Sequence, residues 1–96
     1  MAYLQVQDAA VATGDGTVFH PLQEGNPALY SGKVKFSITI GDTATVLVKG
    51  RVHPGAPWQT LDTVSSSESA EVDAYTDMKC EITVWVAGTV DAWVQF

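Results

Sequence analysis

The sequence predicts a small all-β domain, either an antiparallel β-sandwich or a jelly-roll-like barrel of about seven to eight strands. Three observations support this prediction. Apolar and polar residues alternate with a period of two in several segments, turn residues recur at intervals of about 8–12 residues, and no segment has a long helical pattern. The 96 residues correspond to one domain, 1–96, whose first part, 1–32, is expected to be an irregular segment packing on the sandwich or reaching out from it.

The first third carries the weaker strand signals. Residues 2–7 alternate between apolar and polar types, and the Asp-Gly pair at 15–16 indicates a turn. Residues 20–32 contain two prolines and two glycines. This composition predicts an irregular excursion over the sandwich, with a short strand near 28–30.

The clearest alternation lies in the middle of the chain. In 33–40 every even position is apolar and every odd position is polar, which is typical of a half-buried strand. A Gly-Asp-Thr turn separates it from a second strand at 44–52, and the spacing predicts that the two form a hairpin. The prolines and glycine of 53–57 predict a turn, interpreted as a corner between sheets, before a strand at 58–64.

The last third begins with a polar loop at 65–69, a weak strand at 70–75 and a turn at 76–78. Residues 79–96 are predicted to form the strongest hairpin, closed by the loop 87–89. Parity would then place four residue pairs across it on one face: Cys80 with Phe96, Ile82 with Val94, Val84 with Ala92 and Val86 with Val90. Trp85 and Trp93 would lie on the opposite face, which predicts that both faces of this hairpin are covered.

Trp58 and Leu61 pose a separate problem. Strict alternation places them on opposite faces of the strand 58–64, so both can be in the core only if both faces are covered or a bulge intervenes. The sequence therefore leaves open whether Trp58 is covered by its own chain or by a neighbouring subunit.

Charge and composition exclude several classes of partner. Eleven acidic and five basic side chains give a net charge of −6, which lacks the basic footprint of nucleic-acid binding and disfavours an acidic membrane surface. Cys80 is the only cysteine, so no intrachain disulfide and no multi-thiolate metal site are expected. We find no secretory signal pattern and no apolar run of about 18 residues. The expected setting is a reducing one, with assembly in a cytoplasm.

Candidate catalytic groups are weak. His20 and His53 each precede a proline and are interpreted as turn residues, and the carboxylates between Asp62 and Glu81 as a solvated acidic face. Neither a Ser-His-Asp arrangement nor the acidic residues around Asp15 carry a local signature of hydrolysis or calcium binding. We therefore expect no enzyme and no cofactor. The aromatic residues leave one alternative, a sugar-stacking platform, which predicts that Trp58 or Trp93 is exposed.

Residues 33–96 resemble small β-sandwich virion proteins of tailed bacteriophages. The resemblance is carried by a central block and by a closing strand pair, whose matching residues are Thr45-Val46, Val48, Gly50, Trp58, Leu61 and Thr63, then Gly88-Thr89-Val90, Ala92 and Val94. The first third of the chain departs from the pattern.

The resemblance implies a capsid decoration, or cement, protein, or else a tail or fibre accessory module. A decoration protein would sit on the outer capsid as a homotrimer, bind the major capsid protein and tie capsomers together, after assembly in the host cytoplasm. We expect Tyr30, Trp85 and Trp93 at the subunit interface. We expect Tyr3, His20 and Leu22 to contact the capsid.

Overall fold

Two four-stranded antiparallel sheets pack face to face in the computed structural model, which describes residues 3–96. Met1 and Ala2, which belong to the predicted domain 1–96 and strand 2–7, lie outside the described residues. The elements in chain order are β1 (Tyr3–Ala10), β2 (Gly14–Asp15), α1 (Ala28–Ser31), β3 (Lys33–Ile40), β4 (Thr43–Arg51), β5 (Gln59–Val64), β6 (Glu68–Asp73), β7 (Asp77–Ala87) and β8 (Val90–Gln95).

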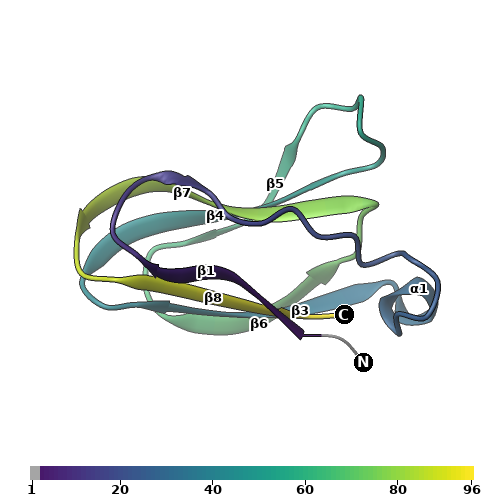
Figure 1. Cartoon of the computed structure of the whole chain (residues 1–96), viewed down its shortest axis with the longest axis horizontal. Coiled ribbons are helices and arrows are strands. Elements are labelled where there is room, and N and C mark those ends of the chain that lie inside the picture. The colour runs from purple at the N-terminus through teal and green to yellow at the C-terminus, as the bar shows by residue number, and fades with distance from the viewer. Residues whose placement is uncertain (1–2) are drawn as a thin grey trace.

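The strand order defines the fold. One sheet runs β1-β8-β3-β6 and the other runs β2-β7-β4-β5, and Figure 1 shows them as the lower and upper layers. This interleaved order of eight strands in two sheets is that of a jelly roll. The predicted class, an all-β sandwich or jelly-roll-like barrel of seven to eight strands, is confirmed.

The core lies between the layers and follows the predicted alternation. Even positions of β3, β4 and β8 are buried, and these side chains are Val34, Phe36 and Ile38, then Ala44, Val46 and Val48, then Val90, Ala92 and Val94. Phe19 and Phe96 stack with ring centroids 5.3 Å apart at one end of this core. Burial of these apolar side chains is the main driving force for folding, at roughly 25 cal/mol per Å².

Both predicted hairpins are wrong in their pairing. Strand β3 pairs with β6 and β8, whereas β4, which follows it, pairs with β5 and β7 in the other sheet. Likewise β7 and β8 belong to different sheets, so Cys80 does not pair with Phe96, nor Val86 with Val90. Parity is satisfied equally by a hairpin and by an arch between sheets, because both turn the same set of side chains toward the core.

The segment 53–57 is also corrected. It was interpreted as a corner between sheets, but it belongs to the loop between β4 and β5, consecutive strands that pair within one sheet. Figure 1 shows this loop projecting beyond the sandwich above β5. His53 Nδ1 accepts a hydrogen bond from the Gly55 N–H at 3.0 Å, and Ala56 N–H donates to the His53 carbonyl, so the loop tip is a closed turn.

Bulges explain two further departures from strict alternation. On β7 the register shifts after Ile82, and Trp85 comes opposite the buried Ala44 while Val84 and Val86 become exposed. The predicted aliphatic row of β7 therefore ends at Ile82. On β5 the shift falls at Leu61, which packs against the core.

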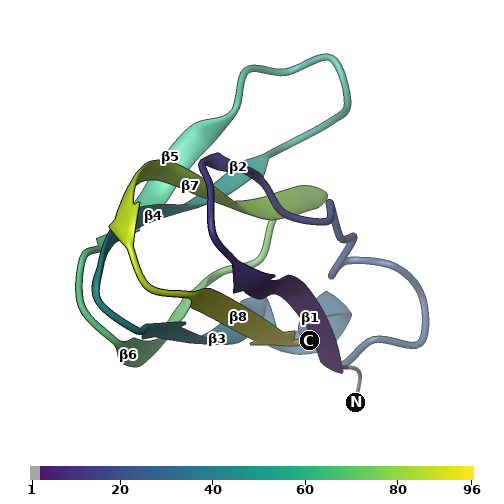
Figure 2. The same ribbon diagram turned by 60° about the vertical axis from the view of Figure 1, so that its left-hand side comes forward.

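The first third is partly regular. Strand β1 pairs with β8 at the edge of the sheet, as Figure 2 shows, and β2 pairs with two residues of β7. The predicted short strand near 28–30 is wrong, because Ala28–Ser31 forms one helical turn closed by Gly32 at φ +70. Between these elements, 16–27 is irregular and is held to β7 by backbone hydrogen bonds, one of them between Phe19 and Met78.

Candidate functional site

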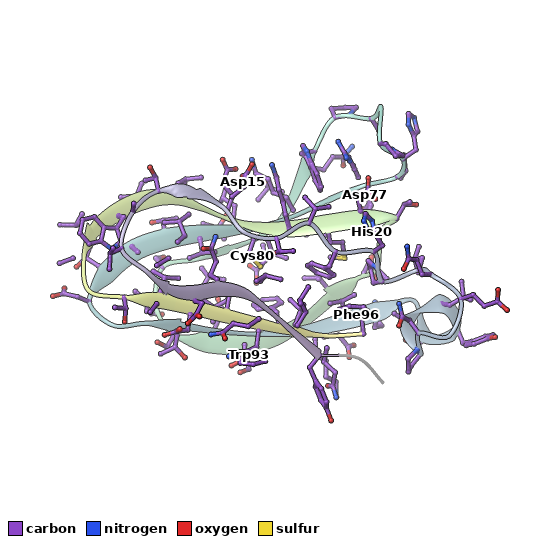
Figure 3. The ribbon with its side chains drawn as sticks, viewed as in Figure 1. Asp15, His20, Asp77, Cys80, Trp93 and Phe96 are labelled. Atoms are coloured by element: carbon purple, nitrogen blue, oxygen red, sulfur yellow. The ribbon has the colours of Figure 1, made fainter. Side chains whose placement is uncertain are left out.

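The two outer faces of the sandwich differ in what their side chains do. We call the outer side of β2-β7-β4-β5 the paired face, because ion pairs cover it. We call the outer side of β1-β8-β3-β6 the open face, because it carries exposed aromatic rings and a groove. Figure 3 shows Asp15 on the first of these sheets and Trp93 projecting from the second, with Cys80 between the layers.

Asp77 is the centre of the paired face. Although acidic, it is only 3% exposed. Its Oδ2 accepts a hydrogen bond from Arg51 Nε at 2.8 Å, and its Oδ1 lies 2.8 Å from His20 Nδ1. Burial alone would raise the pKa of the Asp77 carboxyl, but the hydrogen bonds and positive charges of Arg51 and His20 outweigh burial and hold the pKa below its ordinary value.

Trp58 is covered by cations of its own chain. The Arg51 guanidinium lies 4.3 Å from the ring centroid and the Lys79 ammonium lies 4.5 Å from it. Lys79 also donates to Asp15 Oδ2 at 3.1 Å. Because a cation over an indole face is attracted by the ring quadrupole, this arrangement stabilises the ring without any neighbouring subunit. The open question about Trp58 is thereby answered.

Lys49 and Glu81 complete the paired face. Lys49 Nζ lies 2.6 Å from Glu81 Oε1, although the angles do not meet those of a hydrogen bond, so the contact is one between charges. The cationic groups of this face thus meet carboxylates of the same chain, and they offer little unmatched charge to a ligand.

The open face is organised in rows of residues across four strands. One row runs Gln5, Trp93, Ser37 and Ser69, and the next runs Tyr3, Gln95, Lys35 and Glu71. Trp93 is 49% exposed and Tyr3 is 70% exposed. Since serine is small, the two serines next to Trp93 leave a hollow beside its ring.

That hollow is a groove of about 320 Å³. The residues lining it are Tyr3, Lys35, Phe36, Ser37, Ser69, Trp93, Val94 and Gln95. An adjoining depression of about 220 Å³ shares Lys35 and Gln95 and extends to Ala28 and Phe96. The groove therefore opens on the middle of the sheet and not at its edge, because Trp93 and Ser37 belong to β8 and β3.

Lys35 differs from the other basic residues. Each of the other four holds a carboxylate, in the pairs Lys33–Asp73, Lys49–Glu81, Arg51–Asp77 and Lys79–Asp15. Within residues 3–96, Lys35 has no ion pair and no side-chain hydrogen bond. The groove that it lines contains no carboxylate, in a chain with eleven.

The structure brings together two of the six residues singled out from the sequence. Trp93 and Tyr3 both line the groove. Tyr30 is 86% exposed on α1 and lies outside it. Trp85 is half-buried on β7, where its Nε1 donates to the Gly88 carbonyl at 2.9 Å.

The two remaining residues lie in the irregular segment before α1. His20 is bound to Asp77, and Leu22 is half-buried beside the buried Pro21. The sequence reasoning missed that Lys35 and Ser37 accompany Trp93. Their odd positions in 33–40 already placed them on the outer face, but only the strand order places β3 beside β8.

Other kinds of site were also sought. Among the described residues no group of three or more His, Cys, Asp and Glu side chains could hold a metal ion. Within the same part of the chain no helix is long and apolar enough to span a membrane. Burial raises the pKa of the Cys80 thiol to about 12, so Cys80 is a protonated core residue at neutral pH.

The fold has a counterpart among solved structures. The crystal structure of the SPBc2 prophage-derived protein YomS matches with a TM-score of 0.73 and 14% sequence identity, over 97% of this chain and 88% of that one. At this identity the likeness shows a shared fold. Comparisons with protein-family models and with curated proteins find no match to this chain.

Proposed function

We propose that the chain is a structural component of a bacteriophage virion, and more specifically a capsid decoration protein. In this proposal it binds the major capsid protein on the outer surface of the capsid as a homotrimer, after assembly in the host cytoplasm. Its role is to stabilise contacts between capsomers, with no catalytic step and no cofactor.

The observation that carries the proposal is the fold shared with a prophage-derived protein over nearly the whole length of both chains. The jelly-roll strand order adds an argument by analogy, since viral capsid domains use this architecture often. The phage-like pattern in residues 33–96 is independent of both, because it rests on the sequence.

The surface supports an assembly role. Tyr3, Tyr30 and Trp93 are large, exposed and aromatic, and such residues are enriched at protein interfaces. Val52 is also exposed, in the loop that projects beyond the sandwich. We assign Tyr30 and Trp93 to the subunit interface and Tyr3 and Leu22 to the capsid contact. Trp85 and His20 have smaller roles there, because each is already bound within its own chain.

The test is binding to purified capsids of the phage that encodes the chain, measured by co-sedimentation, together with the mass in solution by light scattering. We expect a trimer that binds assembled capsids but not free coat protein. Tyr30→Ala should weaken trimer formation. A monomer without affinity for capsids would overturn the proposal, and binding to purified tails instead would favour the tail or fibre accessory role.

A further inference from the structure

We propose that the groove on the open face binds an acidic saccharide, a pyranose bearing a carboxylate, with the apolar side of the ring on Trp93. This binding activity is separate from capsid attachment and does not require it. Three features of the groove carry the proposal: the exposed indole, the unused hydroxyl groups and the unpaired ammonium.

The indole supplies the apolar contact. Trp93 is half exposed in the middle of a sheet, on β8, which is paired on both sides. Figure 3 shows it projecting from the outer side of the sandwich. A pyranose has one face of C–H groups, and an exposed aromatic ring gains free energy when such a face covers it. Tyr3, diagonal to Trp93 across β1 and β8, extends the aromatic surface.

The serine hydroxyl groups supply polar contacts. Ser37 and Ser69 face each other across β3 and β6 and line the groove. Neither hydroxyl group has a side-chain hydrogen-bond partner within residues 3–96. Each can both donate and accept, which suits the hydroxyl groups around a sugar ring.

Lys35 supplies the charge that selects an acidic ligand. It is the unpaired cation of the described chain, and no carboxylate lines the groove with it. A ligand carboxylate would therefore find a cation with no competing anion in the groove. Neutral saccharides would lose this contact.

The position of the groove disfavours an extended peptide. A peptide that adds to a sheet needs a free strand edge, but β3 and β8 are paired on both sides. Recognition must therefore use side chains alone. The volume of about 320 Å³ lies at the lower end of ligand pockets, which are about 300–1,000 Å³, and fits one or two sugar rings.

The experiment follows the three indole N–H signals in ¹⁵N–¹H spectra of the full chain during titration with digalacturonate. We expect the Trp93 signal to shift and the Trp58 signal to stay. The methyl ester of the same disaccharide has the same rings without the charge, and should bind about threefold to fivefold more weakly. Lys35→Gln should remove that difference between the two ligands.

Matched variants separate the groove from general effects. Trp93→Ala should weaken binding by about tenfold or more, and Trp93→Tyr should recover part of it. Tyr30→Ala, which removes an exposed aromatic ring outside the groove, should leave binding unchanged.

Three results would overturn the proposal. The absence of any Trp93 shift at high millimolar digalacturonate would remove the site. Equal binding of the methyl ester would remove the role of Lys35. An equal shift with a tetraglutamate peptide would show a carboxylate site without saccharide recognition. None of these bears on capsid binding, so the two proposals fail separately.

Discussion

The two outer faces of this sandwich contain similar residue types and use them differently. On the paired face, Trp58 lies under Arg51 and Lys79, and the cations there meet carboxylates. On the open face, Trp93 and Lys35 line a groove and have no such partners. An aromatic ring beside a cation is therefore a stabilising contact on one sheet and a candidate binding site on the other.

Removal of the Asp77 charge should break the paired face most severely. Asp77→Asn keeps the shape but leaves Arg51 and His20 without a buried anion, so we expect the free energy of unfolding to fall by about 2–4 kcal/mol. Urea denaturation monitored by circular dichroism measures this loss. A change below about 0.5 kcal/mol would mean that the network adds nothing to stability.

The two tryptophans give the second largest contrast. Trp58→Ala should lower the free energy of unfolding by about 1–2 kcal/mol, because it removes the ring that Arg51 and Lys79 cover. Trp93→Ala should cost less than about 1 kcal/mol, since its ring is half exposed. Thermal denaturation of both variants tests the order, and a larger loss for Trp93 would contradict the distinction between the faces.

Acid should remove the contribution of Asp77. Its pKa is held below 3.8 in the folded state, so its stabilisation is complete above the unfolded-state pKa and is lost as pH falls through the lower folded-state value. The stability difference between the native chain and Asp77→Asn should therefore narrow below about pH 4. Unfolding curves at several pH values from 6 to 2 measure it. A constant difference would assign the effect to packing.

An exposed ion pair provides a smaller effect. Lys33 and Asp73 are paired across β3 and β6, and the pKa of Lys33 is raised by the hydrogen bond and charge of Asp73. Both side chains are exposed, so solvent screens the pair and Lys33→Gln should not change stability measurably. The same denaturation assay, run beside Asp77→Asn, makes the comparison between an exposed pair and a buried one.

The smallest expected effect is none. Cys80 lies between the sheets with its pKa raised to about 12, so it should not react with a thiol reagent at pH 8 in the native chain. Trp93→Ala should leave this protection intact. Rapid labelling in that variant would show that a change on the open face had loosened the core.

Several elements follow from local sequence because they depend on local physics. The strand 33–40 was predicted with the bounds that β3 has, since polar and apolar residues alternate there without a break. The faces of Lys35, Ser37 and Trp93 follow from the same alternation. The turn at 28–31 was missed because a single helical turn closed by Gly32 has too few residues to show a period.

The sequence alone determined the class of fold, the set of core side chains on β3, β4 and β8, and which residues face outward. It could not determine which strands are neighbours, because a hairpin and an arch between sheets place the same side chains inward. Only the tertiary structure placed β8 between β1 and β3, and thereby set Trp93 beside Ser37 and near Lys35. It likewise placed Arg51 and Lys79 over Trp58, because contacts between distant residues depend on strand order and not on local alternation.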